Sequence, residues 1–445
     1  MLKKILITAQ LIIIIAFSNI IFAQNSVPVS RITLSEAQEM AQENYPLTSQ
    51  YDIIERTKSF SLSNANKAYL PQGTISAQAT WQSDVISIPD INLDGLELPG
   101  IGNIDLPAIE MPTIDKDQYR IVAELTQLIW DGGRVSAQKK SLEANAEVQK
   151  RQIDNQIYAL RERVNNIYFG ILLMQGQLGS QNILESELQR NYDRVTTYVK
   201  NGVANEGDLN VIRVEQLRAR QQRIQIESSL EAYLQMLSVL IGESVTTKTE
   251  FVKPNVEQEI YNTNALNRPE MAMFDAQLDM AESQRSLLNS TILPTIGAFA
   301  QGGYGKPGLN MLQNEFKPFF IGGIRLSWNI GNLYTLKSDK QKIDLQKSSI
   351  DAQRQTFVQN INLMIPQQQI EIDKYKKTMK DDDEIIDLQT KILQASEIKV
   401  GNGAMTVSDL IKDINALEGA KQAKLLHETQ YLMSIYSLKH TVNQE

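Results

Sequence analysis

The chain repeats itself, and this internal duplication limits its possible folds more than any other feature. In the first part of each copy, matching positions lie 223 residues apart, and further along the spacing falls to 201 and stays constant. A single change of spacing means a single insertion, between Pro71 and Leu125. We therefore predict two homologous halves, residues 24–250 and 251–445. The matching positions include Asn44 with Asn267, Pro71 with Pro294, Asn201-Gly202 with Asn402-Gly403, and Asp208-Leu209 with Asp409-Leu410.

The first residues read as an export signal. Lys3 and Lys4 precede an almost wholly apolar run over residues 5–22, and Ala23 supplies a small residue at the end of that run. This order of charge, apolar stretch and small residue is typical of a cleaved secretory signal peptide. We predict a signal peptide over residues 1–23 and a mature protein outside the cytoplasm.

Each half shows the same order of elements: short helix, strand, strand, long helix, turn, short helix. The first short helix is expected to open at the capping box Ser35-x-x-Gln38 and to run to about Tyr69. Ile75, Ala77, Ala79 and Trp81 alternate with polar residues, which indicates a strand with one apolar face. The strands are expected at about 72–85 and 118–130 in the first half, and at about 295–304 and 318–330 in the second.

Two very long helices follow the strand pairs, at about 135–200 and 336–401. Their apolar residues recur in a heptad pattern, which requires partner helices. A helix of this length spans about 100 Å. The two short helices of each half, placed end to end, have about the same length, so each half is expected to form a rod of paired helices.

Four strands are too few to close a barrel, and open sheet edges cannot face lipid. Several copies must therefore pool their strands, and three copies supply twelve. The fold class we predict is an α+β membrane protein: a trimeric twelve-stranded β-barrel, with four strands per chain, continued by a long α-helical coiled-coil barrel.

Composition removes most catalytic chemistry. The chain has no cysteine, only two histidines and a net charge of −8. We find no catalytic residues, no phosphate loop and no metal-spaced cluster, so we expect no enzyme activity, no cofactor, no metal site and no nucleic-acid partner. His427 and His440 are interpreted as ordinary helix-face residues.

The sequence resembles the TolC-type outer membrane factor family over nearly the whole mature chain. The residues that carry the resemblance are Leu34-Ser35-Glu36-Ala37, Leu70-Pro71, Leu293-Pro294, the segment from Ile129 to Arg134, and the paired Gly-x5-Asp-Leu turns. The resemblance implies a homotrimer in the cell outer membrane whose helical part lies in the periplasm. It also implies a passive exit duct that receives substrates from a periplasmic adaptor protein and an inner-membrane transporter of the RND or ABC class.

The resemblance places two kinds of site at the helical turns. Gly202 and Gly403 end the long helices, and by the resemblance this tip docks the adaptor. Asp409 matches the acidic ring of the family's periplasmic aperture, and Asp208 is its counterpart in the first half; both also suit the start of a helix. Val400 and Met405 occupy the family's gating positions, so an ionic lock of the family's kind is not expected here.

Two further groups lie elsewhere. Asp381, Asp382, Asp383 and Glu384 are expected on a solvated exterior face, and the acidic loop of residues 85–117 holds the insertion. Aromatic residues near the strand ends suit membrane-interface girdles. These are Trp81, Tyr119, Trp130, Tyr304, Phe320 and Trp328.

Two alternative interpretations remain open. In the first, the chain forms a trimeric coiled-coil surface stalk or adhesin anchored by a β-barrel. In the second, it is a soluble periplasmic helical adaptor. The two strand pairs and the central duplication argue against the stalk, and the aromatic-flanked strands argue against the adaptor. A heat-labile trimer in the outer-membrane fraction distinguishes the duct from both.

Overall fold

A computed structural model describes residues 30–85, 97–98, 102–103, 114–202, 204–255, 267–311 and 313–444. The predicted signal peptide at residues 1–23 lies outside the described residues, as does most of the acidic loop. The chain divides into two units. A helical unit holds residues up to 50, 153–271 and 355 onward, and a sheet unit holds residues 51–152 and 272–354.

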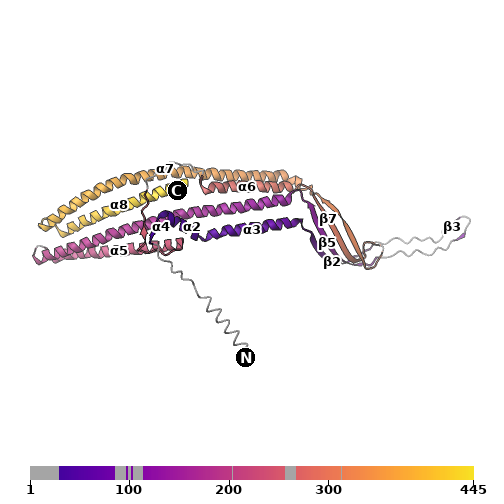
Figure 1. Cartoon of the computed structure of the whole chain (residues 1–445), viewed down its shortest axis with the longest axis horizontal. Coiled ribbons are helices and arrows are strands. Elements are labelled where there is room, and N and C mark those ends of the chain that lie inside the picture. Colours follow the sequence, from indigo (N-terminus) through magenta and orange to yellow (C-terminus); the bar gives the residue numbers. More distant parts are fainter. Residues whose placement is uncertain are drawn as a thin grey trace, which may run out of the picture. The chain divides into compact units, whose positions relative to one another are not determined.

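The helical unit contains paired helices (Figure 1) and a small two-stranded sheet of β1 and β6. The Tyr168 hydroxyl lies within hydrogen-bond distance of the Ile32 and Val252 carbonyl oxygens, at 2.9 and 2.8 Å, and its one O–H ties the small sheet to a long helix. Tyr168 and Phe169 are fully buried at the centre of the apolar core. The elements are β1 (Arg31–Ile32), α2 (Leu34–Asn44), most of α4 (Arg134–Lys200), α5 (Glu206–Ile241), β6 (Glu250–Phe251), most of α7 (Asn332–Gly401) and α8 (Val407–Val442). The parts of α4 and α7 before residues 153 and 355 belong to the sheet unit.

The first helix begins earlier than the sequence pattern suggests. Thr33, not Ser35, caps α2: the Thr33 hydroxyl accepts from the Glu36 N–H, and the Glu36 carboxylate accepts from the Thr33 N–H. The single helix expected over about 35–69 is also divided, because the Asn44-Tyr45-Pro46 segment interrupts it. Pro46 has no N–H to continue α2 and instead opens a short 3-10 turn, Pro46–Thr48.

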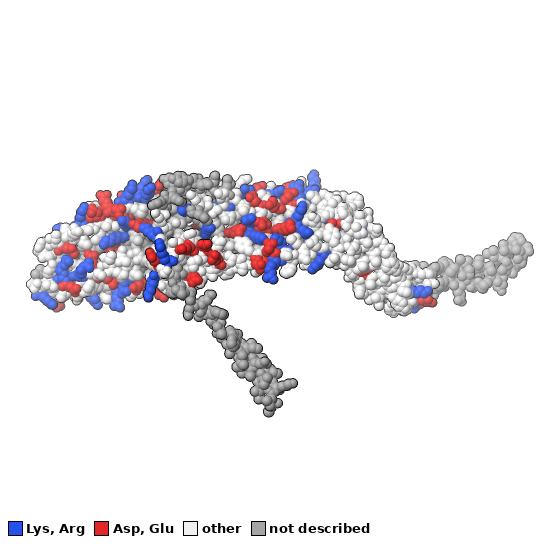
Figure 2. Space-filling model, in the orientation of Figure 1, with Lys and Arg blue, Asp and Glu red and all other residues white. Residues whose placement is uncertain are grey.

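The sheet unit holds four antiparallel strands in the order β2-β5-β7-β8. Charged side chains crowd the helices, whereas the strand region of Figure 2 is nearly bare of them. No helix among the described residues is long and apolar enough to cross a membrane. The elements are α3 (Ser49–Asn66), β2 (Gln72–Trp81), β3 (Glu97–Leu98), β4 (Gly102–Asn103), β5 (Asp117–Trp130), α6 (Pro269–Ser290), β7 (Thr295–Lys306) and β8 (Lys317–Ser327).

The turn between β5 and α4 explains two of the sequence motifs. The Asp131 carboxylate accepts from the backbone N–H groups of Gly133 and Val135, at 2.9 and 2.6 Å, and so caps the start of α4. Gly132 has a positive φ of 67°, and a Cβ there would lie 2.6 Å from the Leu293 Cβ. The Leu-Pro segment before β7 therefore packs directly on this turn.

In the first half of the chain, side-chain hydrogen bonds join the end of α2 to the end of α5, an arrangement called here a clasp. The side-chain amide of Asn44 donates to the carbonyls of Val239 and Leu240, at 3.2 and 3.1 Å, near the end of α5. Gly242 ends α5 in the left-handed conformation, and a Cβ there would lie 2.6 Å from the Asn44 side chain. The last residue of α2 thus holds the last turn of α5.

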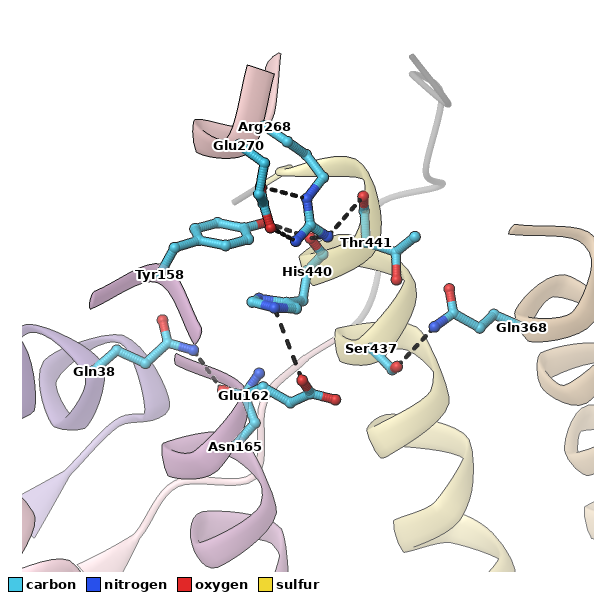
Figure 3. A network of polar contacts seen from close by, with 10 residues as sticks. All are labelled: Gln38, Tyr158, Glu162, Asn165, Arg268, Glu270, Gln368, Ser437, His440 and Thr441. Carbon is cyan, nitrogen blue, oxygen red and sulfur yellow. Dashed lines mark hydrogen bonds and ion pairs between the residues drawn. The ribbon is translucent and has the colours of Figure 1, made fainter. Parts of the chain in front are cut away.

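The second half has a clasp on the matching carbonyls, although its donor is Arg268 and not Asn267, the counterpart of Asn44 (Figure 3). The Arg268 guanidinium donates to the carbonyls of His440 and Thr441, at 3.4 and 3.3 Å, and pairs with Glu270. Asn443 ends α8 in the left-handed conformation, where the first half has Gly242, and its amide donates to the Asn267 carbonyl at 2.7 Å. The capped carbonyls in the two halves lie 201 residues apart, the spacing found in the sequence.

Candidate functional site

The main sheet separates apolar from polar side chains with few exceptions. The strand register places Ile75, Ala123 and Gly302 side by side on one face, and Thr74 beside Glu124 on the other. The first, called here the apolar face, comprises Gly73, Ile75, Ala77, Ala79, Trp81, Asp117, Tyr119, Ile121, Ala123, Leu125, Gln127, Ile296, Ala298, Ala300, Gly302, Tyr304, Lys306, Pro318, Phe320, Gly322, Ile324 and Leu326. The polar face comprises Gln72, Thr74, Ser76, Gln78, Thr80, Gln118, Arg120, Val122, Glu124, Thr126, Leu128, Thr295, Gly297, Phe299, Gln301, Gly303, Gly305, Lys317, Phe319, Ile321, Gly323, Arg325 and Ser327.

The apolar face is exposed, and most of the polar face on β2 and β8 is exposed as well. On the apolar face Ile75 is 80% exposed, Ile324 75% and Phe320 71%. A water-soluble sheet covers its apolar face, because burying apolar surface is what drives folding in water. An exposed apolar face of this extent marks a surface for contact with lipid or another protein.

The six aromatic residues singled out in the sequence lie near the two ends of the sheet. Trp81, Tyr119, Tyr304 and Phe320 lie toward the ends of their strands at which β2 leads to β5 and β7 to β8. Trp130 and Trp328 lie at the opposite end, where the Trp328 indole N–H donates to the Ile292 carbonyl at 2.9 Å. Sequence reasoning missed Phe316, whose ring stacks on Tyr304 with 5.7 Å between centroids. It stands just before β8, outside the alternation that identified the others.

The turns of the helical unit end the long helices as the sequence predicts. Gly403 has a φ of 69°, its N–H donates to the Val400 carbonyl, and the Ala404 N–H donates to the Lys399 carbonyl. This pattern satisfies the last carbonyls of α7. Gly202, with a φ of 74°, makes the first of these bonds to Val199. Apart from the adjoining residues, no atom of the described residues lies within 4 Å of a Cβ built on Gly202 or Gly403, so only the backbone conformation requires glycine there.

Both aspartates of the turns lie in the first turn of a helix. Asp208 exchanges hydrogen bonds with Asn205 at the start of α5. The Asp409 carboxylate accepts from the Thr406 hydroxyl at 2.7 Å and pairs with Lys412 at 2.9 Å. The Lys412 ammonium and the Thr406 hydroxyl hold the pKa of Asp409 below its usual value. Asp409 is therefore ionised at neutral pH, but its charge is partly balanced by Lys412.

Val400 and Met405, which occupy the family's gating positions, make apolar contacts. Val400 is buried in an apolar cluster that joins the two helical hairpins near their turns, and Met405 packs against the same cluster. One ion pair also crosses between the hairpins, from Arg194 on α4 to Glu397 on α7, at 3.3 Å. Apolar packing thus holds the turn region of this chain together.

The interpretation of the acidic run was wrong for Asp382. Its side chain is buried, with 5% of the residue exposed, and its carboxylate lies 2.7 Å from the His427 Nδ1. The neighbouring Asp383 pairs with Lys424. The sequence pattern could not show this, because an acidic run on a long helix has the same appearance whether or not a histidine faces it from α8.

His440 is likewise not an ordinary helix-face residue. Its ring stacks on Tyr158 with 4.3 Å between centroids, beside the Arg268 clasp (Figure 3). Burial, with a contribution from Arg268, lowers the pKa of His440 to about 4, so the imidazole is neutral at physiological pH. Within the described ranges no group of His, Asp or Glu is arranged to hold a metal ion.

Comparison with known proteins identifies the fold. The family model for outer membrane efflux proteins matches residues 62–243. The CusC channel has a TM-score of 0.67 at 14% identity, with 94% of this chain and 93% of CusC covered. The CmeC outer membrane channel of Campylobacter jejuni has a TM-score of 0.64 at 13% identity, with 92% of this chain and 85% of CmeC covered. The open-state MtrE channel of Neisseria gonorrhoeae has a TM-score of 0.63 at 13% identity, with 92% and 89% covered. No curated protein matches.

A charge on each face of β5 tests the assignment of the two faces. Ala123 lies on the apolar face and Thr126 on the polar face. We expect Ala123→Arg to cost about 2–4 kcal/mol of folding free energy in a bilayer, the range for an arginine near the midplane. Thr126→Arg is expected to be tolerated. Urea titration of protein folded into lipid vesicles measures both, and equal tolerance at the two positions would contradict the assignment.

Proposed function

Because residues 62–243 match the family model for outer membrane efflux proteins, we propose that the chain is the exit duct of a tripartite efflux or type I secretion system, assembled as a homotrimer. It is an outer-membrane channel protein rather than an enzyme. The observation that carries the proposal is the four-stranded sheet with an exposed apolar face, a polar face and two open edges.

The open edges call for further copies of the chain. β2 and β8 each pair on one side only. Their free N–H and C=O groups need partners in a membrane, where water does not reach them. Since β2 and β8 run in opposite directions, the β8 of one copy can continue the antiparallel order with the β2 of the next. Three copies would close twelve strands, with the apolar face toward lipid, the polar face toward the lumen and the aromatic residues at the two interfaces.

The helices support the same assembly. α5 and α7 carry large exposed apolar side chains besides those buried in the unit, which is unusual for helices that face only water. They include Leu217 and Ile224 on α5, and Leu363, Ile370, Leu388, Ile392 and Ile398 on α7. In the proposed trimer these side chains pack against neighbouring copies as a periplasmic coiled-coil barrel. The two matching clasps support the division into repeats at 24–250 and 251–445.

Disulfide cross-linking tests the closure directly, because the chain has no cysteine of its own. Within one chain β2 and β8 are separated by two strands, or about 14 Å, too far for a disulfide. We expect Ser76→Cys combined with Ile321→Cys or Gly323→Cys to give, on oxidation, linked species that end at three chains. Each single cysteine is the control and should give none. Ladders that stop at two chains or continue beyond three would contradict the trimer.

We place adaptor docking at the turns that contain Gly202 and Gly403, with an RND or ABC transporter behind the adaptor. Gly403→Val should abolish export and leave membrane insertion intact, because its strain of about 1 kcal/mol is confined to the turn. Gly133→Val is the matched control: Gly133 also has a positive φ, 81°, and open space around it, but lies at the start of α4. Loss of insertion with retained docking in Gly403→Val would reverse the proposed orientation.

Threefold symmetry would also bring three copies of Asp409 around one axis, with Asp208 further from it. We expect the reconstituted channel to be cation-selective and to be blocked by multivalent cations from the side of the turns. Asp409→Asn should weaken both effects, because it leaves Lys412 unbalanced, and Asp208→Asn should act less. Asp387→Asn is the control, since Asp387 also pairs with a lysine, Lys391, at 2.6 Å. Unaltered selectivity and block in Asp409→Asn would leave that residue as a helix-start residue only.

A further inference from the structure

Two arginines on the polar face lie over phenyl rings. The guanidinium of Arg120, on β5, is 5.6 Å from the ring centroid of Phe319, on β8. The guanidinium of Arg325, on β8, is 4.7 Å from the ring centroid of Phe299, on β7. Both distances lie within the range of cation–π attraction. The polar face therefore carries two composite surfaces, each with a planar cation above an aromatic ring.

Glycines on the neighbouring strand hold these rings against the sheet. Phe319 pairs with Gly303, and a Cβ at Gly303 would overlap the Phe319 ring. Phe299 pairs with Gly323, where a Cβ would lie 3.2 Å from the Phe299 ring. A side chain in place of either glycine would displace the ring beside it. The glycines thus fix both rings across the sheet, where an arginine can cover each of them.

The charge of this face is positive between its ends. Two charged side chains besides the two arginines lie there: Glu124, which is 3.8 Å from Arg325, and Lys317, which pairs with Glu315 at 3.3 Å. Arg120 has no carboxylate partner within the part of the chain that the structure describes. Its other neighbours across the strands are neutral, namely Gln78 on β2 and Gly305 on β7. One positive charge per chain is left over, although the whole chain has a net charge of −8.

We propose that the polar face binds organic anions that carry an apolar or aromatic body, and we call this binding surface the anion lane. This inference rests on the proposed duct. A guanidinium offers several N–H donors in a plane that suits carboxylate, sulfonate and phosphate oxygens. The phenyl ring beside it offers contact to the apolar body. Symmetric copies repeat both pairs around the lumen, and a ring of arginines is the arrangement that favours anions in a pore.

Single-channel recording of the full chain in a planar bilayer tests the lane, with 1-naphthalenesulfonate as the probe. We expect this anion, added at the strand-loop side, to block the wild-type channel, whereas a naphthyl trimethylammonium cation should not bind the lane. The double variant Arg120→Gln/Arg325→Gln should raise the half-blocking concentration about tenfold. Its reversal potential should also shift toward cations.

Three further variants separate charge from stacking. Arg120→Lys keeps the charge, so the reversal potential should stay while the block weakens about threefold. Phe319→Leu should behave in the same way, because it removes the ring and keeps the guanidinium. Ser76→Gln, a neutral change on the same face, is the control for bulk and should leave the reversal potential unchanged.

The outcomes distinguish this inference from the function on which it rests. Channels that open normally but keep the wild-type block and reversal potential in the double variant would overturn the anion lane and leave the duct intact. A wild-type chain that forms no channel at all would overturn the duct, and the lane with it.

Discussion

Hydrogen bonding at the edges of the four-stranded sheet is the constraint on which the rest of the structure depends. A bilayer offers no water to an unpaired backbone N–H or C=O group. β2 and β8 each expose such a row of groups, and the sheet presents its apolar side outward. A single copy satisfies neither requirement. The proposed trimer satisfies both, because every edge meets another edge and the whole apolar face meets lipid.

The helices also expose apolar side chains that the described part of one chain leaves uncovered. The long helices α4 and α7 bury one heptad stripe within the helical unit, in clusters built around Tyr168 and around Leu188, yet α5 and α7 keep other apolar side chains exposed. The clasps at Asn44 and Arg268 fix where α5 and α8 end in each half. Association through helices and closure through strands would therefore occur together, and neither unit needs a large core of its own.

The sequence predicts the features that depend on periodicity and on glycine. Alternation identified the strands, because one side chain in two faces lipid or core. Constant spacing identified the turns, because Gly202 and Gly403 both take a left-handed conformation.

The sequence analysis missed contacts between distant elements. The Asp382–His427 pair joins two helices, and the Arg120–Phe319 pair crosses the sheet from β5 to β8. Neither leaves a local pattern, since each depends on register and not on neighbouring residues. The cap at Thr33 was missed for a smaller reason, because both Thr33 and Ser35 are good helix caps.

Fluorescence of the native tryptophans tests most directly whether the apolar face lies in lipid. The chain has three tryptophans, and all of them, Trp81, Trp130 and Trp328, stand near the ends of the strands. Protein folded into vesicles can be compared in lipids brominated near the glycerol end of the acyl chain and in lipids brominated near the terminal methyl. We predict strong quenching of tryptophan emission by the first and weak quenching by the second, because the aromatic residues sit at the two interfaces. Emission that neither lipid quenches, but that a water-soluble quencher reduces, would contradict the account.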